Sequence, residues 1–280
     1  MAAPDDAAST APAATRRTRV QQPRVGELVA AELRRRILAS GDEQYALPTQ
    51  DQLVQEFGVS YPSVREAVRI LETEGLVTVR RGKIGGLETH RPDERSAAYH
   101  LGLVLQGDGV SVADLAGALQ QLEPLGAAAC AGRADRKRAV LPLLRDNIER
   151  SAELVSDGVD FTHTAREFHD LVVACTPNAT LRSVIRSLVA LWSAQEEAWA
   201  ESRSSRGEYP SVAEARAVVR THGRIADAIE AGDAAEAERL VRVHVAATQD
   251  LVLADDPEGV VDAAYARRRG AEPTLDSGRL

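Results

Sequence analysis

A short turn between two amphipathic segments constrains this chain more than any other feature. Gly58-Val59-Ser60 separates an apolar-periodic stretch at 48–57 from a second one at 61–74. Glycine adopts the backbone conformation that a tight turn needs, and serine caps a helix that tolerates a proline such as Pro62 in its first turn. The pattern predicts two short helices joined by a tight turn.

A further helix precedes this pair, and strand patterns follow it. Apolar residues recur with helical spacing from Arg24 onward. Gly75 ends the helix at 61–74, after which 76–80 and 87–90 can pair as strands across a glycine-rich turn. The order helix, helix, turn, helix, hairpin is that of a winged helix-turn-helix.

The helix at 61–74 carries side chains suited to reading DNA. A recognition helix enters the major groove with its N-terminal residues against base edges, while basic hairpin residues approach the phosphates. The candidate DNA contacts are Thr49, Ser60, Tyr61, Ser63, Arg65, Arg69, Arg80, Arg81, Gly82 and Lys83. The alternative is a solvated helix on which Arg65 pairs with Glu66 or Glu72.

The remainder of the chain has helical periodicity and no strand pattern. Amphipathic stretches run over 111–131, 135–156, 158–175, 179–202, 211–231 and 233–254. Stretches of this length favour an antiparallel bundle. The expected fold class is therefore mainly α: an N-terminal winged helix-turn-helix with three helices plus a β-hairpin wing, and a C-terminal all-α antiparallel helical bundle.

Composition shifts and breaks in periodicity set the expected domain boundaries. We expect a disordered arm at 1–20, a winged helix-turn-helix DNA-binding domain at 21–91, a linker with room for one short helix at 92–110, a helical domain at 111–254 and a flexible tail at 255–280. The net charge of −8 is uneven, since the N-terminal third is mildly basic and the rest is acidic. This asymmetry indicates two domains with different partners.

Bulk composition argues against membrane and secreted classes. With 44% hydrophobic and 27% charged residues, the chain is typical of soluble globular proteins. No apolar run reaches the roughly 18–20 residues of a membrane span, and the N-terminus lacks a secretory signal pattern. Cys130 and Cys175 lie in apolar helical patterns, which favours buried thiols in a reducing compartment. We therefore expect a cytoplasmic protein.

Two parts of the chain resemble known domains. Residues 24–90 resemble the winged helix of the GntR family through Leu47-Pro48-Thr49, Gly58-Val59-Ser60, Val64-Arg65-Glu66-Ala67, Leu71-Glu72, Glu74-Gly75-Leu76-Val77 and Arg80-Arg81-Gly82. The helical part resembles the FadR-type, or FCD, effector domain through Leu122-Glu123-Pro124-Leu125, Glu167-Phe168-His169, Pro177-Asn178, Thr221-His222 and Arg242-Val243-His244. The resemblance implies a homodimer that binds a palindromic double-stranded DNA operator, commonly as a repressor, and leaves it when a small-molecule metabolite binds.

The resemblance has two departures on the DNA-binding side. Many family members read DNA with an arginine in the second helix and another near the start of the recognition helix. Asp51 and Tyr61 stand at these positions. Since Asp51 faces an unfavourable phosphate field, it either orients Arg65 or accepts a hydrogen bond from a cytosine amine. The usual operator of the family is therefore not expected.

The FCD resemblance implies a divalent metal site. Such domains commonly bind the ion through one Asp and three His, often with a carboxylate effector above it. His169, His222 and His244 match the histidines, and neutral imidazoles suit an ion of the zinc or nickel type. Ala165 stands in place of the Asp, and His163 lies on the far side of that helix. The alternative is three histidines satisfied by hydrogen bonds in a polar pocket.

The resemblance also places an effector near these histidines. The expected contacts are Gln120, Arg166 and Asn178. The arginine that many members carry in the first effector helix is absent from Leu119-Gln120-Gln121, and with the missing Asp this predicts a less acidic or more apolar effector. Trp192 and Trp199 share one helix face and favour core or dimer packing.

Other functions stay open at this point. Three histidines could serve a metal-dependent enzyme, or a regulator for which the ion itself is the signal. A helical interaction module with a vestigial DNA-binding head is a further alternative. Because the sequence has no nucleophile motif, phosphate-binding glycine loop or CxxC pair, we expect no enzymatic activity.

Overall fold

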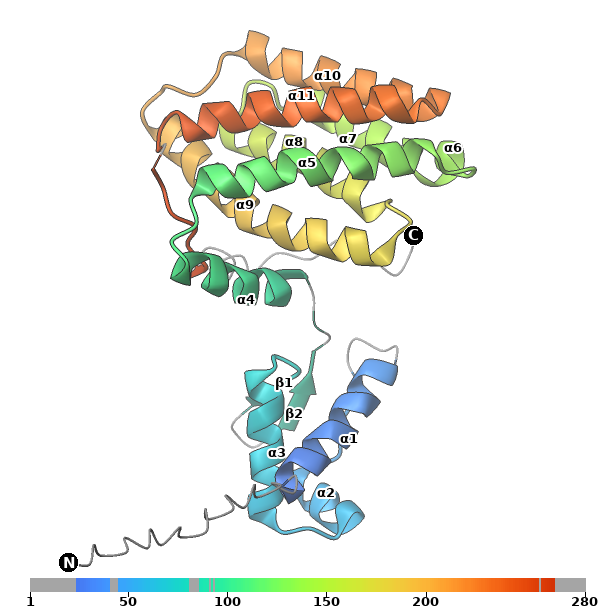
Figure 1. Ribbon diagram of the computed structural model, residues 1–280, viewed down its shortest axis with the longest axis vertical. Helices are drawn as coiled ribbons and strands as arrows, with labels where there is room; N and C mark the ends of the chain where they lie inside the picture. The colour runs from blue at the N-terminus through green and yellow to red at the C-terminus, as the bar shows by residue number, and fades with distance from the viewer. Residues whose placement is uncertain are drawn as a thin grey trace, which may run out of the picture. The chain divides into compact units, whose positions relative to one another are not determined.

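The computed structural model describes residues 24–40, 45–80, 86–90, 92, 94–256 and 258–264. The chain divides into two compact units, Met1–Arg91 and Pro92–Leu280 (Figure 1). The arm expected at 1–20 lies outside the described residues, as do Arg81, Gly82 and Lys83 of the hairpin turn and the end of the expected tail.

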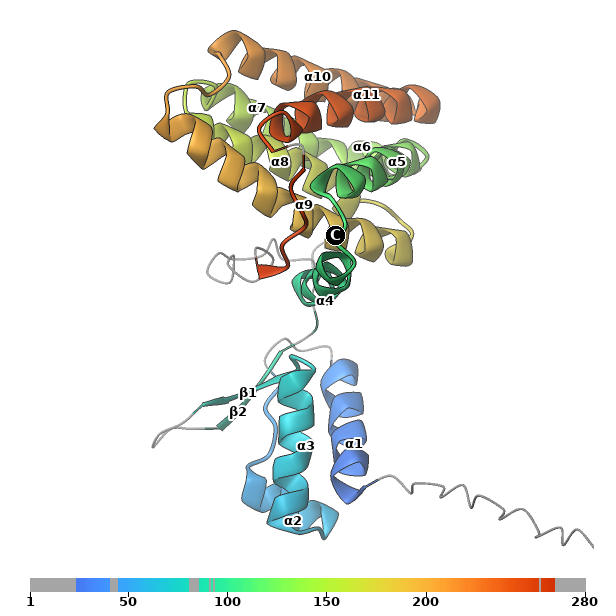
Figure 2. The same cartoon turned by 60° about the vertical axis from the view of Figure 1, so that its left-hand side comes forward.

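The first unit consists of three helices and a hairpin. Its elements are α1 (Val25–Ala39), α2 (Gln50–Phe57), α3 (Tyr61–Thr73), β1 (Val77–Arg80) and β2 (Gly86–Thr89). The strands pair antiparallel with Val77 opposite Thr89, and Figure 2 shows the hairpin extending away from the helices. The predicted winged helix-turn-helix is confirmed.

Local sequence explains the turn between α2 and α3. The Thr49 hydroxyl accepts the backbone N–H of Gln52, whose side chain accepts the N–H of Thr49 in return, so a capping box starts α2. Gly58 ends α2 at φ 63°, a left-handed conformation in which glycine has no Cβ penalty. Ser60 then precedes α3, with Pro62 in its first turn.

Side chains from all three helices form the core of the first unit. Leu33 of α1, Leu53 of α2 and the α3 residues Val64, Ala67 and Leu71 are fully buried. The α3 positions recur with helical spacing, so one stripe of this helix is buried and the opposite face is exposed. Burial of each leucine contributes about 1.5–3 kcal/mol. The core therefore fixes which face of α3 points outward.

The second unit is a helical bundle. Its helices are α4 (Glu94–Gly107), α5 (Val112–Ala131), α6 (Arg136–Ala139), α7 (Leu141–Glu153), α8 (Gly158–Ala174), α9 (Ala179–Ser205), α10 (Val212–Ala231) and α11 (Ala234–Leu253). α5 packs along α11, while α8 packs between α7 and α9 (Figure 1). Across the described residues the regular structure is helical apart from the hairpin, which confirms the predicted fold class. None of the described helices has both the length and the apolar character of a membrane span.

The segment expected as a linker at 92–110 contains α4. Ala98 of α4 is fully buried, and a Cβ added at Gly102 would come within 2.9 Å of Leu191 of α9. Glu94 and Arg186 form an ion pair between the same two helices. One short helix was expected within this segment, and the structure has a helix of 14 residues packed against α9. Most helical stability comes from such tertiary packing of an apolar face rather than from local propensity.

Part of the tail expected at 255–280 packs on the second unit. Val260 forms an antiparallel bridge with Ser111, and Val261 and Ala263 are each 1% exposed. Backbone hydrogen bonding and burial hold this segment, so the expectation of a flexible tail is corrected as far as the structure describes it.

The single helix expected at 135–156 is two helices, α6 and α7. Val140 separates them, and Pro142 lies in the first turn of α7. Proline has no N–H to donate to the carbonyl of Arg138, and its ring would clash there in a continuous helix. The break therefore follows from the proline, which is tolerated only near a helix start.

Candidate functional site

The exposed face of α3 carries unpaired arginines. Among the described residues, the Arg65 and Arg69 guanidinium groups form no ion pair or hydrogen bond. Glu66, which was considered as a partner for Arg65, instead lies 3.7 Å from Arg24 through Oε1 and Nη1. Both arginines are exposed, opposite the buried stripe of the same helix. The described contacts leave their charges available to an external anion.

Asp51 of α2 is hydrogen-bonded to Tyr61 of α3. The Tyr61 hydroxyl donates to Asp51 Oδ1 at 3.1 Å. This hydrogen bond, followed by the charge of Asp51, raises the pKa of Tyr61. Asp51 was expected either to orient Arg65 or to accept a hydrogen bond from a cytosine. No contact between Asp51 and Arg65 is present among the described residues. The hydrogen bond places the Asp51 carboxylate, a hydrogen-bond acceptor, at the edge of the exposed α3 face. Asp51 lies in the first turn of α2, where the helix dipole favours a negative charge.

Other predicted DNA contacts already have partners within the unit. The Thr49 hydroxyl accepts the Gln52 N–H at 3.3 Å, and Ser60 Oγ and Ser63 Oγ lie 3.0 Å apart. Arg80 Nε lies 2.6 Å from Glu88 Oε2 across the hairpin. An exposed ion pair contributes no more than about 1 kcal/mol, so Glu88 does not prevent Arg80 from moving to a phosphate.

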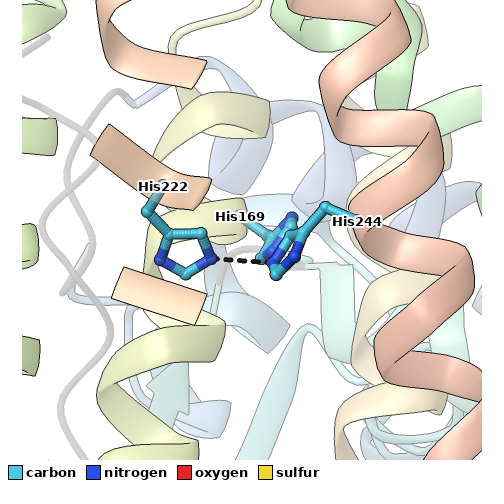
Figure 3. Close-up of side chains that lie close together, drawn as sticks. All are labelled: His169, His222 and His244. Carbon is cyan, nitrogen blue, oxygen red and sulfur yellow. Dashed lines mark hydrogen bonds between the residues drawn. The ribbon is translucent and has the colours of Figure 1, made fainter. Parts of the chain in front are cut away.

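The second unit brings three buried histidines together from three helices. His169 lies on α8, His222 on α10 and His244 on α11 (Figure 3). One ring nitrogen of each lies within 4.8 Å of the others, and His222 Nε2 and His244 Nε2 are 2.9 Å apart. We call these three residues the histidine cluster.

Burial keeps two members of the histidine cluster uncharged. Burial, followed by the charge of His244, lowers the pKa of His222 well below its usual value. Burial, followed by the charge of His169, lowers the pKa of His244 to about 3. Both imidazoles are therefore neutral near pH 7 and retain a lone pair, which is the form that binds a metal ion.

Glu123 of α5 lies beside the histidine cluster. Its side chain is 1% exposed, its Oε1 accepts from Arg166 Nη2 at 3.0 Å, and its Oε2 lies 3.1 Å from His169 Nδ1. Burial alone would raise the pKa of Glu123, but the charge of Arg166 and the contact with His169 lower it to about 2. The carboxylate lies on the Nδ1 side of the His169 ring, which is a place from which a carboxylate can orient a metal-binding histidine.

Sequence reasoning assigned no role to Glu123. The signal was present, because Glu123 falls on the buried stripe of α5 between Leu119 and Ala127, both fully buried. A charged residue at a core position is rarely buried without a partner. The partner, Arg166, lies 43 residues away in the sequence.

The histidine cluster fits an ion of the zinc type. Two nitrogens bound to a tetrahedral zinc at about 2.0–2.1 Å lie roughly 3.3–3.4 Å apart. The 2.9 Å between His222 and His244 therefore needs a small opening, and separations of up to 4.8 Å within the cluster need to close. Ala165, at the position where the resemblance implied an aspartate, lines the adjoining cavity without offering a ligand. His163 is exposed, as predicted for the far side of α8. Three nitrogen ligands leave room for further ones from the cavity.

A cavity of about 90 Å³ adjoins the histidine cluster. Helices α8, α9, α10 and α11 line it, together with the connection from α9 to α10. Besides the histidines, its polar lining includes Arg166 and Glu196, and its aromatic lining includes Phe161, Trp199 and Tyr209. By volume it can hold several waters or a small organic molecule.

The cavity contains one of the three residues expected to contact an effector. Arg166 lines it, whereas Gln120 donates to Gln249 Oε1 at 3.0 Å and Asn178 caps α9 by accepting the Leu181 N–H at 3.0 Å. Gln120 and Asn178 are not among the residues that line the cavity, and their side chains are used by packing and capping. Trp199 packs against the hydrophobic core, as predicted, and also lines the cavity.

Comparisons with known proteins agree with this architecture. A model of the FCD domain matches residues 114–247, and a model described as bacterial regulatory proteins, gntR family, matches residues 22–83. The chain is 28% identical over 226 residues to the Uxu operon regulator of Haemophilus influenzae, which covers 79% of this chain and 78% of that protein. Its fold resembles a Streptococcus agalactiae GntR structure with a TM-score of 0.61 and 21% identity, covering 80% of this chain and 99% of that one.

Proposed function

Since the chain belongs to the GntR family of bacterial regulatory proteins and carries an FCD domain, we propose that it is a repressor released by an effector. In this proposal two copies bind a palindromic operator, and a small metabolite in the cavity beside the histidine cluster ends the binding. The family is one of transcription regulators, so a metal-dependent enzyme is set aside.

The exposed face of α3 supports the DNA-binding part of the proposal. Arg65 and Arg69 have no side-chain partner among the described residues, and Ser60 and Ser63 lie beside them at the start of the helix. The N-terminal half of a recognition helix reads base edges, while arginines bind guanine or phosphate. One such helix reads half a site, so two copies related by a two-fold axis require a palindrome.

The histidine cluster and its cavity support the effector part. His169, His222 and His244 would hold a zinc- or nickel-type ion, with Glu123 orienting His169. When bound, the ion would supply a Lewis-acid site for an oxygen or nitrogen of the effector. Arg166 lies in the wall of the cavity, where it is buried and forms an ion pair with Glu123.

Selection of bound DNA from a random pool tests the operator. The full-length protein should recover a short palindrome, whereas Arg65→Ala should lose about 1–3 kcal/mol of specific binding. Arg220→Ala, at an exposed position on α10, is the matched control and should recover the same motif. Recovery of no motif, with binding that only fades as salt rises, would contradict the proposal.

The histidine cluster also supports a second candidate, in which the metal ion itself is the signal. The two candidates are distinguished by loading the purified protein with zinc or nickel and titrating it with the selected operator. In the first proposal the ion alone leaves operator affinity within a few-fold of the metal-free value. A tenfold or larger change with the ion and no organic ligand would favour the metal-responsive regulator.

A further inference from the structure

A buried carboxylate oxygen without a partner lies at the cavity. Glu196 of α9 lines the cavity, and its Oε2 atom is buried with no hydrogen bond from any described residue. An unpaired buried acceptor is costly, more so when it is charged. Burial raises the pKa of Glu196, against the opposing charge of Arg166. In its ionised form Glu196 needs a donor at Oε2, and the cavity is where a donor can enter.

The arginine near Glu196 is already paired elsewhere. Arg166 is the only lysine or arginine among the described residues that line the cavity. Its Nη2 donates to Glu123 Oε1 at 3.0 Å, and its Nε lies 4.0 Å from Asp170 Oδ1. The charge of Arg166 is shared among Glu123, Glu196 and Asp170. Because Glu214 lines the cavity as well as Glu196, the carboxylates here outnumber the one guanidinium group. In the metal-free protein a further anion would be repelled here and a cation attracted.

The lining also provides an aromatic wall beside this carboxylate. α8 lines the cavity from Phe161 to His169, a length of about 12 Å at 1.5 Å per residue, with the histidine at one end. Glu196 and Trp199 are about one turn apart on α9, and the Trp199 and Tyr209 rings lie 5.8 Å apart. Aromatic faces attract cations through the ring quadrupole, so the wall and the carboxylate favour the same charge.

We propose that the effector of this protein carries a protonated amino group that binds Glu196, between the histidine cluster and the aromatic pair Trp199 and Tyr209. The inference rests on the proposed function, in which this cavity is the effector site. It names the ligand class as small primary amines. The ammonium donates to Oε2 of Glu196, and its carbon chain contacts the aromatic pair.

Three four-carbon probes test the ligand class on the full-length protein. Butylamine, butan-1-ol and butanoate each have four carbons, and their head groups are cationic, neutral and anionic near pH 7. They are titrated in an amine-free buffer, with tryptophan fluorescence and thermal unfolding as the readouts. Trp199 lines the cavity and is one of two tryptophans in the chain, so the emission reports on it. Butylamine should bind at least tenfold more tightly than either other probe.

Two glutamine variants locate the contact. Glu196→Gln should weaken butylamine binding at least tenfold while leaving butan-1-ol unchanged. Glu201→Gln, at an exposed position on the same helix, is the matched control and should bind all three probes as the unchanged protein does. No binding of butylamine, binding of butanoate at equal or greater affinity, or an unchanged Glu196→Gln variant would each overturn the inference.

Operator binding is measured separately, so the two proposals fail independently. If butylamine binds through Glu196 but leaves the operator complex intact, the inference on ligand class stands and effector-controlled release fails. If butanoate releases the operator and butylamine does not bind, the repressor proposal stands and the inference fails.

Discussion

Arg242 of α11 donates a hydrogen bond from Nη1 to the carbonyl oxygen of Gln120 in α5 at 3.0 Å. That carbonyl has no partner within its own helix, because the residue four positions later is Pro124, which lacks an N–H. A side chain from a neighbouring helix therefore completes the backbone hydrogen bonding of α5 where the proline interrupts it. The bond lies close to Glu123 and His244, so it also supports the helices that carry the site.

Arg242→Met should lower the free energy of unfolding by about 1 kcal/mol, because it leaves a helix carbonyl unpaired at a partly exposed position. Chemical denaturation of the full-length protein measures the loss. Arg239→Met is the matched control, since Arg239 pairs with Glu236 of its own helix. Its effect should stay below about 0.5 kcal/mol. Equal losses from the two variants would contradict the assigned role of Arg242.

Glu123→Ala should destabilise the second unit by about 3–5 kcal/mol, because it leaves the guanidinium of Arg166 buried without its carboxylate. Glu123→Gln keeps the shape and removes the charge, so it should unfold less readily than Glu123→Ala. It should also weaken zinc binding about 10–100-fold, since His169 loses the carboxylate that orients it. Chemical denaturation measures the free energy of unfolding, and competition with a chromophoric chelator measures the zinc affinity. Full zinc affinity in Glu123→Gln would rule out the orienting role.

Tyr61→Phe should alter base preference at one position in each half of the operator. The change removes the hydroxyl that donates to Asp51 and leaves the carboxylate free to move. Selection from a random pool, repeated with Tyr61→Phe and with Asp51→Asn, should change discrimination at the same position by about 1–3 kcal/mol. Affinity for non-specific DNA should rise for Asp51→Asn, because a negative charge near the phosphates is lost. Shifts at unrelated positions would show that the two residues act separately.

Cys130 should react slowly with thiol reagents while the protein is folded. Burial, followed by the charge of Cys175, raises the pKa of Cys130 from 9.0 to about 12, so at pH 8 its thiolate is about a thousandfold scarcer than in an unfolded chain. The labelling rate of the folded protein should rise about tenfold per pH unit between pH 7 and pH 9. Denaturant should make both cysteines react at once. Rapid labelling of Cys130 at pH 7 in the folded state would contradict the described burial.

Local sequence determined much of the first unit. Gly58, Ser60 and Pro62 specify a turn and a helix start through their own backbone preferences, and the apolar stripe of α3 specifies which face is buried. Resemblance to the FCD domain also singled out His169, His222 and His244, and the structure brings them together.

Tertiary structure decided the rest. α4 forms because α9 covers it, and Pro142 divides a helix that periodicity alone had joined. The partners of Glu123, the cavity position of Glu196 and the contact between Asp51 and Tyr61 depend on how separate helices pack. The physical reason is the range of the interactions. Capping, turn geometry and periodicity act over about four residues and can be read along the chain. Burial, ion pairing and cavity shape arise only when distant segments exclude water together.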